Sequence, residues 1–287
     1  MCATSAASRP EAGGASARVG PADVPRASPG SPRGRWNPVE ELAKPLEPSQ
    51  GARVSEHAFS EAERHGLYRA IFERRDVRSQ FLPEPIPAEV LARLLQAAHH
   101  APSVGFMQPW DFLVIENREL RARIQASHDR ENARAAGNYR GERAERYRRL
   151  KLAGILDSPV NLCVTCDRRR GGPHVLGRNS MLEMDRFSTC LAVQNLWLAA
   201  RAEGVGVGWV SILDPVELAE LLGLPEGVEP VAYLCLGYVS EFLEAPELAA
   251  QGWRQRLPLA DLVHGDGWGR PPETQALELA LAGLEPR

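Results

Sequence analysis

The chain has 287 residues, with 34 Lys and Arg against 37 Asp and Glu and a formal net charge of −3 at pH 7. This near balance argues against a general nucleic-acid binder, which would carry a strongly basic face. No apolar run is long enough to span a bilayer, and the five cysteines lack the spacing of a disulfide framework. We therefore expect a protein of a reducing compartment, the cytoplasm.

Residues 1–55 differ in composition from the rest of the chain. They are rich in Ala, Ser, Gly, Pro and Arg and almost without aliphatic periodicity, so they bury too little apolar surface to offset the entropy lost on ordering. We expect a disordered arm, or an extended arm along a partner subunit. A transit peptide is the other interpretation, and Glu11 and Asp23 count against it. Residues 56–287 are expected to form one domain.

The first predicted elements are two helices and a strand. Ser60 and Glu63 have the spacing of a capping box and predict a helix over about 60–75. Its expected apolar face carries Leu67, Ile71 and Phe72. Pro87 predicts the first turn of a second helix, which ends before Pro102. The apolar face of that helix carries Val90, Leu91, Leu94, Leu95 and Ala98. Aromatic and β-branched residues then predict a short strand, Trp110 to Glu116.

The next stretch, 118–151, is strongly charged, with arginines outnumbering acids. It is predicted to be one or two solvated helices, or a mobile basic lid over an anionic ligand. The remaining elements alternate: strands at about 159–166, 207–211 and 230–239, a long helix at about 183–203, and a short helix from Pro215. The apolar face of the long helix is expected to carry Leu191, Leu198 and Ala202. Few strands among long helices predict an α+β fold with a mixed sheet packed by helices.

Two short motifs have structural interpretations. Cys163 and Cys166 form a C-x-x-C inside a predicted strand, where their odd separation places the side chains on opposite faces, so both are expected to be buried structural thiols. "EGVGVGW", at 203–209, lacks the strand before it and the helix after it that a dinucleotide-binding motif needs. It is predicted to be a tight helix-to-strand turn at Gly204 and a closely packed strand.

Charge gathers where the first helix ends, in "IFERRDVRSQF" at 71–81, which places three arginines around Asp76. They are Arg74, Arg75 and Arg78. Guanidinium groups are always charged and bind a phosphate dianion through two parallel hydrogen bonds, so a phosphorylated ligand is one interpretation. Ion pairing with Glu73 and Glu84 is the other, and it needs no ligand.

Four stretches together resemble the flavin-dependent nitroreductase family: "RRDVR" at 74–78, "APSVGFMQPWDF" at 101–112, "GVGWVSILDP" at 206–215 and "GWRQRLPLADLV" at 252–263. The resemblance covers roughly 59–268. Asp76 stands where the general family pattern has Ser, and Phe106 stands where it has Asn. These departures, with Met107, resemble the 5,6-dimethylbenzimidazole synthase branch of the family.

The resemblance implies a mixed central sheet packed by helices and a homodimer with its flavin sites at the subunit interface. It implies no metal site. The residues implied to contact flavin mononucleotide (FMN) are Arg74, Arg75, Asp76, Val77, Arg78, Ser103, Met107, Leu156, Ser211 and Arg256. Asp76 and Ser211 are the implied catalytic residues.

Asp76 is a poor choice for binding an anionic flavin, so its presence indicates chemistry: it is predicted to accept or deliver protons as bonds break. A carboxylate among arginines would otherwise have a lowered pKa and only balance charge. Ser211, at the end of a predicted strand, is implied to position oxygen or relay a proton. Without the resemblance it would be interpreted as a hydrogen-bonding cap.

The resemblance implies oxygen-dependent conversion of reduced FMN to 5,6-dimethylbenzimidazole, the lower ligand of vitamin B12, with release of erythrose 4-phosphate. Flavin is then a substrate, enclosed by Phe106, Met107, Trp110 and the charged stretch at 118–151. Because no nicotinamide-binding signature is present, NAD(P)H is expected to act only through a separate flavin reductase. The alternatives are an NAD(P)H-dependent nitro or quinone reductase that keeps FMN as cofactor, and a flavin storage or delivery protein.

Overall fold

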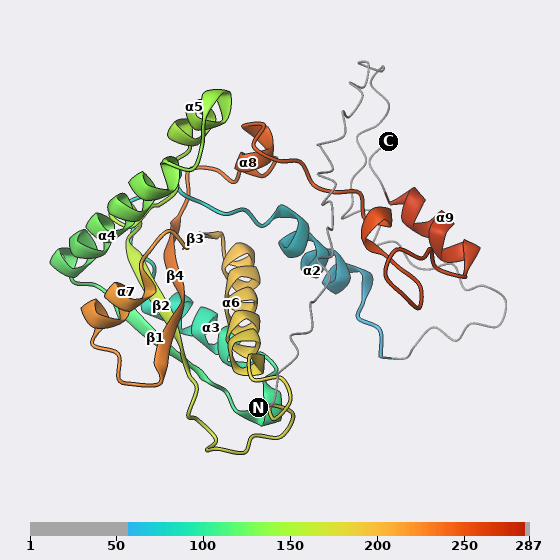
Figure 1. Cartoon of the computed structure of the whole chain (residues 1–287), viewed down its shortest axis with the longest axis horizontal. Coiled ribbons are helices and arrows are strands. Elements are labelled where there is room, and N and C mark those ends of the chain that lie inside the picture. The colour runs from blue at the N-terminus through green and yellow to red at the C-terminus, as the bar shows by residue number, and fades with distance from the viewer. Residues whose placement is uncertain (1–56, 285–287) are drawn as a thin grey trace, which may run out of the picture. The chain divides into compact units, whose positions relative to one another are not determined.

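The computed structural model of the protein describes residues 57–284. They contain a four-stranded sheet with helices on both of its faces (Figure 1). The N-terminal arm predicted at 1–55 lies outside these residues. Among the described residues no helix is long and apolar enough to cross a bilayer.

The sheet has the strand order β1-β2-β4-β3, and every neighbouring pair is antiparallel. The strands are β1 (Trp110–Ile115), β2 (Val160–Asp167), β3 (Val205–Val210) and β4 (Val228–Tyr238). Along the outer edge of β3, Asp76 forms a parallel bridge with Val207. The N–H of Val77 donates to the Val207 carbonyl at 3.0 Å. The predicted α+β fold with a sheet packed by helices is confirmed, although the four strands pair only antiparallel and the parallel pairing is limited to this isolated bridge.

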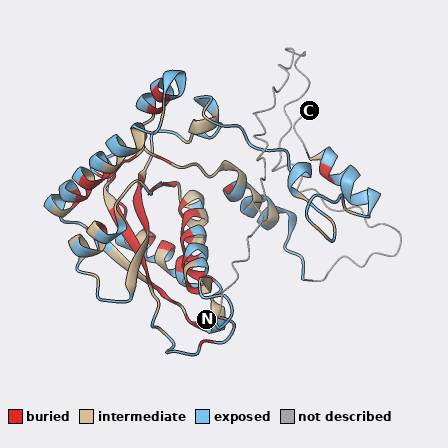
Figure 2. Ribbon diagram, in the orientation of Figure 1, coloured by how far each residue is buried: buried red, intermediate tan, exposed pale blue. Residues whose placement is uncertain are grey.

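The core lies on both faces of the sheet, because β2 and β4 are interior strands (Figure 2). On one face, helices α3 (Ala88–His99) and α6 (Met184–Ala202) pack against Leu162, Leu234 and Leu236. On the other face, α4 (Arg118–Ala136) and α7 (Pro215–Leu222) pack around Tyr233 and Cys235. The alternation of side chains along each strand therefore assigns its residues to two separate cores.

Cys163 and Cys166 are both buried and free, as predicted. Burial raises the pKa of Cys163 to about 12 and that of Cys166 to about 11. Because the thiolate is the reactive form, these thiols are inert at neutral pH.

The N-terminal helix α2 (Glu61–Glu73) begins at the predicted capping box. The Ser60 side chain accepts from the N–H of Glu63 at 3.4 Å, and the Glu63 carboxylate accepts from the N–H of Ser60 at 2.8 Å. The predicted apolar face is wrong for the single chain, because α2 buries Ala70 and leaves Leu67 and Ile71 exposed.

The long helix α6 also buries a different face from the one expected. Its buried apolar residues are Ala192, Val193, Leu196, Trp197 and Ala200, which join the core under α3 and the sheet. Leu191 remains 46% exposed and Phe187 51% exposed. The expected face of Leu191, Leu198 and Ala202 is therefore not the one that packs in the core.

The charged stretch at 118–151 forms two helices, α4 and α5 (Gly141–Arg149), so its predicted helical character is confirmed. α4 is docked on the sheet through Ile124, which is fully buried. The remaining helices are short: η1 (Val104–Phe106), α8 (Glu247–Ala250), η2 (Ala260–Leu262) and α9 (Gln275–Gly283).

Candidate functional site

The segment that follows α2 lies against the edge of β3 because two glycines make room for it. A Cβ added to Gly208 would stand 2.0 Å from the carbonyl oxygen of Val77, and one added to Gly206 would meet the Val77 side chain at 3.0 Å. The predicted turn at Gly204 is confirmed, since this residue has a φ of +75° between α6 and β3. The glycines of "EGVGVGW" thus serve to bring the backbone at 76–77 onto the sheet.

Asp76 is held from two sides. Its Oδ1 accepts from the N–H of Trp209 at 3.1 Å, and its Oδ2 accepts from a guanidinium nitrogen of Arg78. Burial raises the pKa of Asp76 above its ordinary value, while Arg78, the Trp209 N–H and Arg74 oppose the rise. The lowered pKa of a carboxylate that only balances charge is therefore not found, because desolvation is the larger effect. A raised pKa makes a carboxyl group a better proton acceptor than an ordinary aspartate.

Arg74 and Arg256 have no ion-pair partner among residues 57–284. The guanidinium of Arg74 lies 4.8 Å from the centre of the Trp197 ring and makes no hydrogen bond or ion pair with any residue in 57–284. Burial lowers the pKa of Arg74, and the nearby charge of Arg256 lowers it further, against the attraction of Asp76. Arg256 is exposed. Two like charges brought together in this way favour an anion between them.

Arg75, implied by the resemblance to contact FMN, is engaged with backbone carbonyls within the chain. Its guanidinium donates to the carbonyls of Phe72 at 2.7 Å, Arg74 at 2.8 Å and Leu243 at 2.8 Å, and also to that of Glu244. Because a guanidinium has five N–H donors, little capacity remains for a ligand. Arg75 therefore ties the end of α2 to the loop that contains Leu243 and Glu244.

The ion-pair interpretation of these arginines, with Glu73 and Glu84 as partners, does not hold. Glu73 instead pairs with Arg69 at 3.1 Å and with Arg201 at 2.6 Å. Arg78 pairs with Asp76, and its Nη1 lies 3.8 Å from Glu247. The carboxylates near the cluster are thus engaged elsewhere or shared, and Arg74 is left available.

The other implied residues lie at several places. Ser211 is exposed and comes directly after β3, two residues beyond the Trp209 N–H that holds Asp76, about 7 Å along the strand. Val77 is buried, and its N–H is engaged by the Val207 carbonyl. Leu156 is half-exposed, next to Ile155, whose carbonyl accepts from the buried Arg121.

Ser103 and Met107 lie near the opposite end of α6. The Ser103 hydroxyl accepts from the N–H of Gln108 at 3.0 Å, and the N–H of Val104 donates to Ser188 at 3.0 Å. Ser188 and Trp197 are separated by about 14 Å along the helix axis, since each residue adds 1.5 Å. Within one chain, the implied residues are therefore divided between two separate regions, this loop and the Arg74–Arg78 segment, which we call half-sites.

The loop after Ser103 has an unusual backbone. Phe106 and Gln108 have φ angles of +53° and +49°, a region that non-glycine residues seldom occupy. The Phe106 side chain is 83% exposed, so in a single chain it encloses nothing. Trp110 is buried instead, and its Nε1 donates to Nδ1 of His99 at 3.2 Å. The expected enclosure by Phe106 and Trp110 is therefore not seen in the single chain.

Comparison with known proteins shows the family of the chain. A model of the Nitroreductase family matches residues 71–238. The chain belongs to the nitroreductase family. It is 44% identical to a 5,6-dimethylbenzimidazole synthase of Rhodospirillum rubrum over 200 residues, 70% of this chain and 94% of that protein. A synthase of the same name from Rhodobacter capsulatus is 42% identical over 201 residues, 70% of this chain and 96% of the other.

Among solved structures, oxidized iodotyrosine deiodinase bound to FMN and 3-iodo-L-tyrosine is similar, with a TM-score of 0.54 and 26% identity. The match covers 67% of this chain and 96% of that one. The resemblance seen in the motifs, to the nitroreductase family and its synthase branch, is thus confirmed.

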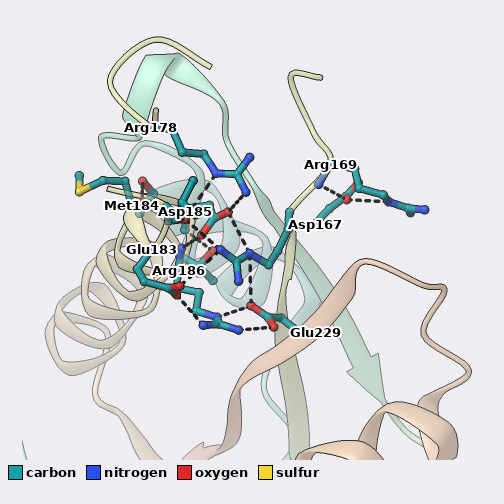
Figure 3. A network of polar contacts seen from close by, with 12 residues as sticks. Asp167, Arg169, Arg178, Glu183, Met184, Asp185, Arg186 and Glu229 are labelled. Atoms are coloured by element: carbon teal, nitrogen blue, oxygen red, sulfur yellow. Dashed lines mark hydrogen bonds and ion pairs between the residues drawn. The ribbon is translucent and has the colours of Figure 1, made fainter. Parts of the chain in front are cut away.

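A second group of arginines, which was not predicted from the sequence, surrounds Asp185 (Figure 3). Arg168 and Arg178 pair with the fully buried carboxylate of Asp185, at 3.2 Å and 2.8 Å. Arg186 pairs with Glu183 at 2.5 Å and with Glu229. These pairs fasten the loop at 168–183 to α6 and β4. The acidic residues Glu183 and Asp185, close to these arginines in the sequence, could have indicated the ion pairs.

Glu247 was also missed, because no motif contains it. It begins α8, and its side chain is 15% exposed beside Arg78. Among residues 57–284, no group of three or more His, Cys, Asp or Glu side chains is arranged to hold a metal ion.

Proposed function

We propose that this protein is a 5,6-dimethylbenzimidazole synthase, which uses O₂ to convert reduced FMN to 5,6-dimethylbenzimidazole with release of erythrose 4-phosphate. The observation that carries the proposal is the position of Asp76. It is a partly buried carboxyl group with a raised pKa, close enough to interact electrostatically with Arg74, which has no ion-pair partner among residues 57–284. A site for binding alone has no use for this acid. The names of the most similar relatives support the same reaction.

The residues present fit FMN. Arg74 and Arg256 lack carboxylate partners among the described residues and would hold the phosphate, whose dianion suits guanidinium donors. The rest of FMN would lie along Val77, Ser211 and Leu156. The second half-site would supply Ser103 and Met107. Arg75 and Arg78 would act indirectly, by fixing the segment and the Asp76 carboxylate.

Reduced FMN supplies the electrons with which O₂ reacts, and its own ring is the material that becomes the product. Asp76 holds or moves the protons that bond cleavage requires, from a position fixed by the N–H of Trp209 and by Arg78. Ser211 offers a hydroxyl two residues further along the same strand, to orient oxygen or relay a proton.

The proposal includes a homodimer. The two half-sites lie about 14 Å apart along α6 in one chain, so a second copy would bring a Ser103 loop to each Arg74–Arg78 segment. Phe187 and Leu191, exposed on α6, would be covered in that dimer. Reduced flavin would come from a separate flavin reductase that uses NAD(P)H. We propose that the reaction takes place in the cytoplasm, where free thiols such as those of this chain stay reduced.

The test is to mix the purified full chain with chemically reduced FMN in air and to identify the products by mass spectrometry. We expect 5,6-dimethylbenzimidazole and erythrose 4-phosphate. Recovery of intact oxidised FMN alone would refute the synthase and leave two classes: a reductase, if nitroaromatic or quinone substrates are then turned over with NAD(P)H, or a storage protein, if they are not.

Asp76→Asn provides the matched control, because it keeps the shape of the side chain and removes its charge. We expect product formation to fall by about 100-fold or more while FMN still binds. Asp76→Ser, which restores the general family residue, should behave in the same way. An Asp76→Asn variant that forms product at the unaltered rate would remove Asp76 from the mechanism.

A further inference from the structure

Glu247 lies close to the Asp76 carboxylate although it is 171 positions away in the chain. Its Oε2 stands 3.8 Å from Nη1 of Arg78, whose Nη2 donates to Asp76. The Arg78 side chain is 12% exposed and the Glu247 side chain 15% exposed. One guanidinium is therefore placed between two carboxylates, of which Glu247 is the more buried and Asp76, with its side chain 30% exposed, is the more open to solvent.

The segment that carries Glu247 is fixed at both ends. Before it, the guanidinium of Arg75 donates to the carbonyl of Leu243 at 2.8 Å. After it, Arg146 of α5 donates to the carbonyl of Gly252 at 3.0 Å. Trp253 packs edge-on against Tyr139 at 5.2 Å between ring centres. Figure 1 shows α8 beside α5, as these contacts require.

The arrangement leaves polar atoms unsatisfied. Within residues 57–284, Nε of Arg78 and Oε2 of Glu247 are buried without a hydrogen-bond partner. An unpaired buried polar atom costs free energy, so stability does not explain why this carboxylate is here. Its electrostatic effect on the neighbouring charged groups explains it better. Because Arg78 has one positive charge, a second carboxylate beside it weakens the attraction that it exerts on Asp76.

We propose that Glu247 is a positioning residue that acts on Asp76 through Arg78: it holds the guanidinium in place and limits the positive charge offered to the catalytic carboxyl group. This inference rests on the proposed function only in naming Asp76 as catalytic. The charged and titratable groups that face Asp76 are Arg78, Arg74, Glu247 and the buried thiol of Cys235, together with the N–H of Trp209. Glu247 is the acid among them that the family motifs do not contain.

The decisive variant is Glu247→Gln, which keeps the side chain's shape and removes its negative charge. Arg78 then attracts Asp76 alone, so Asp76 ionises at lower pH. The inflection of the pH–rate profile for product formation should move to lower pH, with the ionisation constant rising about threefold to tenfold. The direction is the same whether Asp76 acts in its ionised or its protonated form.

Glu241→Gln is the matched control, because Glu241 is an exposed acid six positions earlier in the same segment. Its profile should coincide with that of the unaltered chain. An unmoved inflection in a folded Glu247→Gln variant that still binds FMN would overturn the inference and leave the proposed function intact. A structural role alone would lower the rate at all pH values without moving the inflection.

A binding measurement separates the two proposals. Removing a negative charge beside the arginine cluster should lower the dissociation constant of oxidised FMN about threefold at low salt, as followed by quenching of flavin fluorescence. Glu241→Gln should leave the constant unchanged. If the unaltered chain makes no 5,6-dimethylbenzimidazole, the synthase proposal fails, but this binding difference still tests Glu247. Equal dissociation constants for the two variants would overturn the Glu247 inference whatever the activity.

Discussion

The molecule contains two groups of arginines that look alike in sequence and differ in their partners. In the first, the 74–78 cluster with Arg256, Arg74 has no carboxylate partner among residues 57–284, and Arg75 is bonded only to carbonyl oxygens. In the second, the Asp185 cluster of Figure 3, Arg168 and Arg178 share the buried Asp185, and Arg186 pairs with Glu183 and Glu229.

The difference separates a structural use of arginine from a binding use. A cation whose charge is matched inside the chain stabilises the fold, and a ligand would have to compete with its partner. A partly buried cation without a partner has lost hydration and regains that energy only when an anion binds. Counter-charge, more than the number of arginines, therefore identifies the candidate phosphate site.

The largest expected effect comes from breaking the matched cluster. Asp185→Ala leaves Arg168 and Arg178 without their shared carboxylate, so the free energy of unfolding should fall by about 3 to 5 kcal/mol. Urea denaturation followed by circular dichroism measures it. The control is Asp167→Ala, which removes an ion pair to the more exposed Arg169 and should cost about 1 kcal/mol or less. Equal losses of unfolding free energy in the two variants would mean that the buried ion pairs of Asp185 stabilise the fold no more than the exposed pair of Asp167.

Next in size is the effect of Arg74 on binding. Arg74→Ala should weaken FMN binding by about 2 kcal/mol, roughly 30-fold, because a charge-assisted hydrogen bond to phosphate is lost. Its unfolding free energy should change by less than about 1 kcal/mol, since only the contact with Trp197 is removed. Arg170→Ala, which breaks the pair with Asp111, should show the reverse pattern. Unchanged FMN affinity in Arg74→Ala would contradict the assignment of the phosphate site.

A backbone change can disturb the first cluster without touching an arginine. Gly208→Ala places a methyl group against the carbonyl of Val77, so the segment must shift, at a cost of about 1 to 3 kcal/mol in unfolding free energy. Product formation should fall as well, because Asp76 moves with the segment. Gly66→Ala in α2 is the control: its added Cβ meets nothing within 4 Å, and helix propensity should make it slightly stabilising. Full activity in Gly208→Ala would show that Asp76 tolerates displacement.

The smallest expected effect is on the pH dependence of stability. The pKa of Asp76 is raised in the folded protein, chiefly by burial, so the folded state binds a proton more tightly than the unfolded state. Stability therefore falls as pH rises from the ordinary Asp pKa through the raised one, and the loss persists at neutral pH. Asp76→Asn should melt at a slightly higher temperature than the unaltered chain at neutral pH, and the difference should shrink in acid. A lower melting temperature at neutral pH would mean that pairing with Arg78 outweighs desolvation.

Local signals in the sequence predicted the elements well. The Ser60–Glu63 box begins α2, Pro87 precedes α3, and the glycine at 204 makes the turn into β3, because each acts on residues within one turn of itself. Ser211 follows the end of β3, as predicted, whereas the contact of the Asp76 segment with β3 was found only in the structure.

The features that the sequence did not predict depend on contacts between residues that are far apart in the chain. The buried face of α6 is set by α3 and the sheet, so periodicity alone did not show that Leu191 would stay exposed. The contact of Arg75 with a loop near 243, far along the chain, was likewise not indicated by any local pattern. Glu247 reaches Arg78 by the same loop. Pairings of this kind arise only when the fold brings remote segments together.

Asp76 and Val77, which pair with Val207, also cover part of the edge of the sheet. β3 is the last strand of the sheet among the described residues, and an uncovered strand edge invites pairing with another molecule. The segment at 76–77 occupies part of that edge, and the glycines at 206 and 208 let it approach. Variants that dislodge the segment would therefore be prone to aggregate, and the solubility of each inactive variant has to be measured before its inactivity is assigned to chemistry.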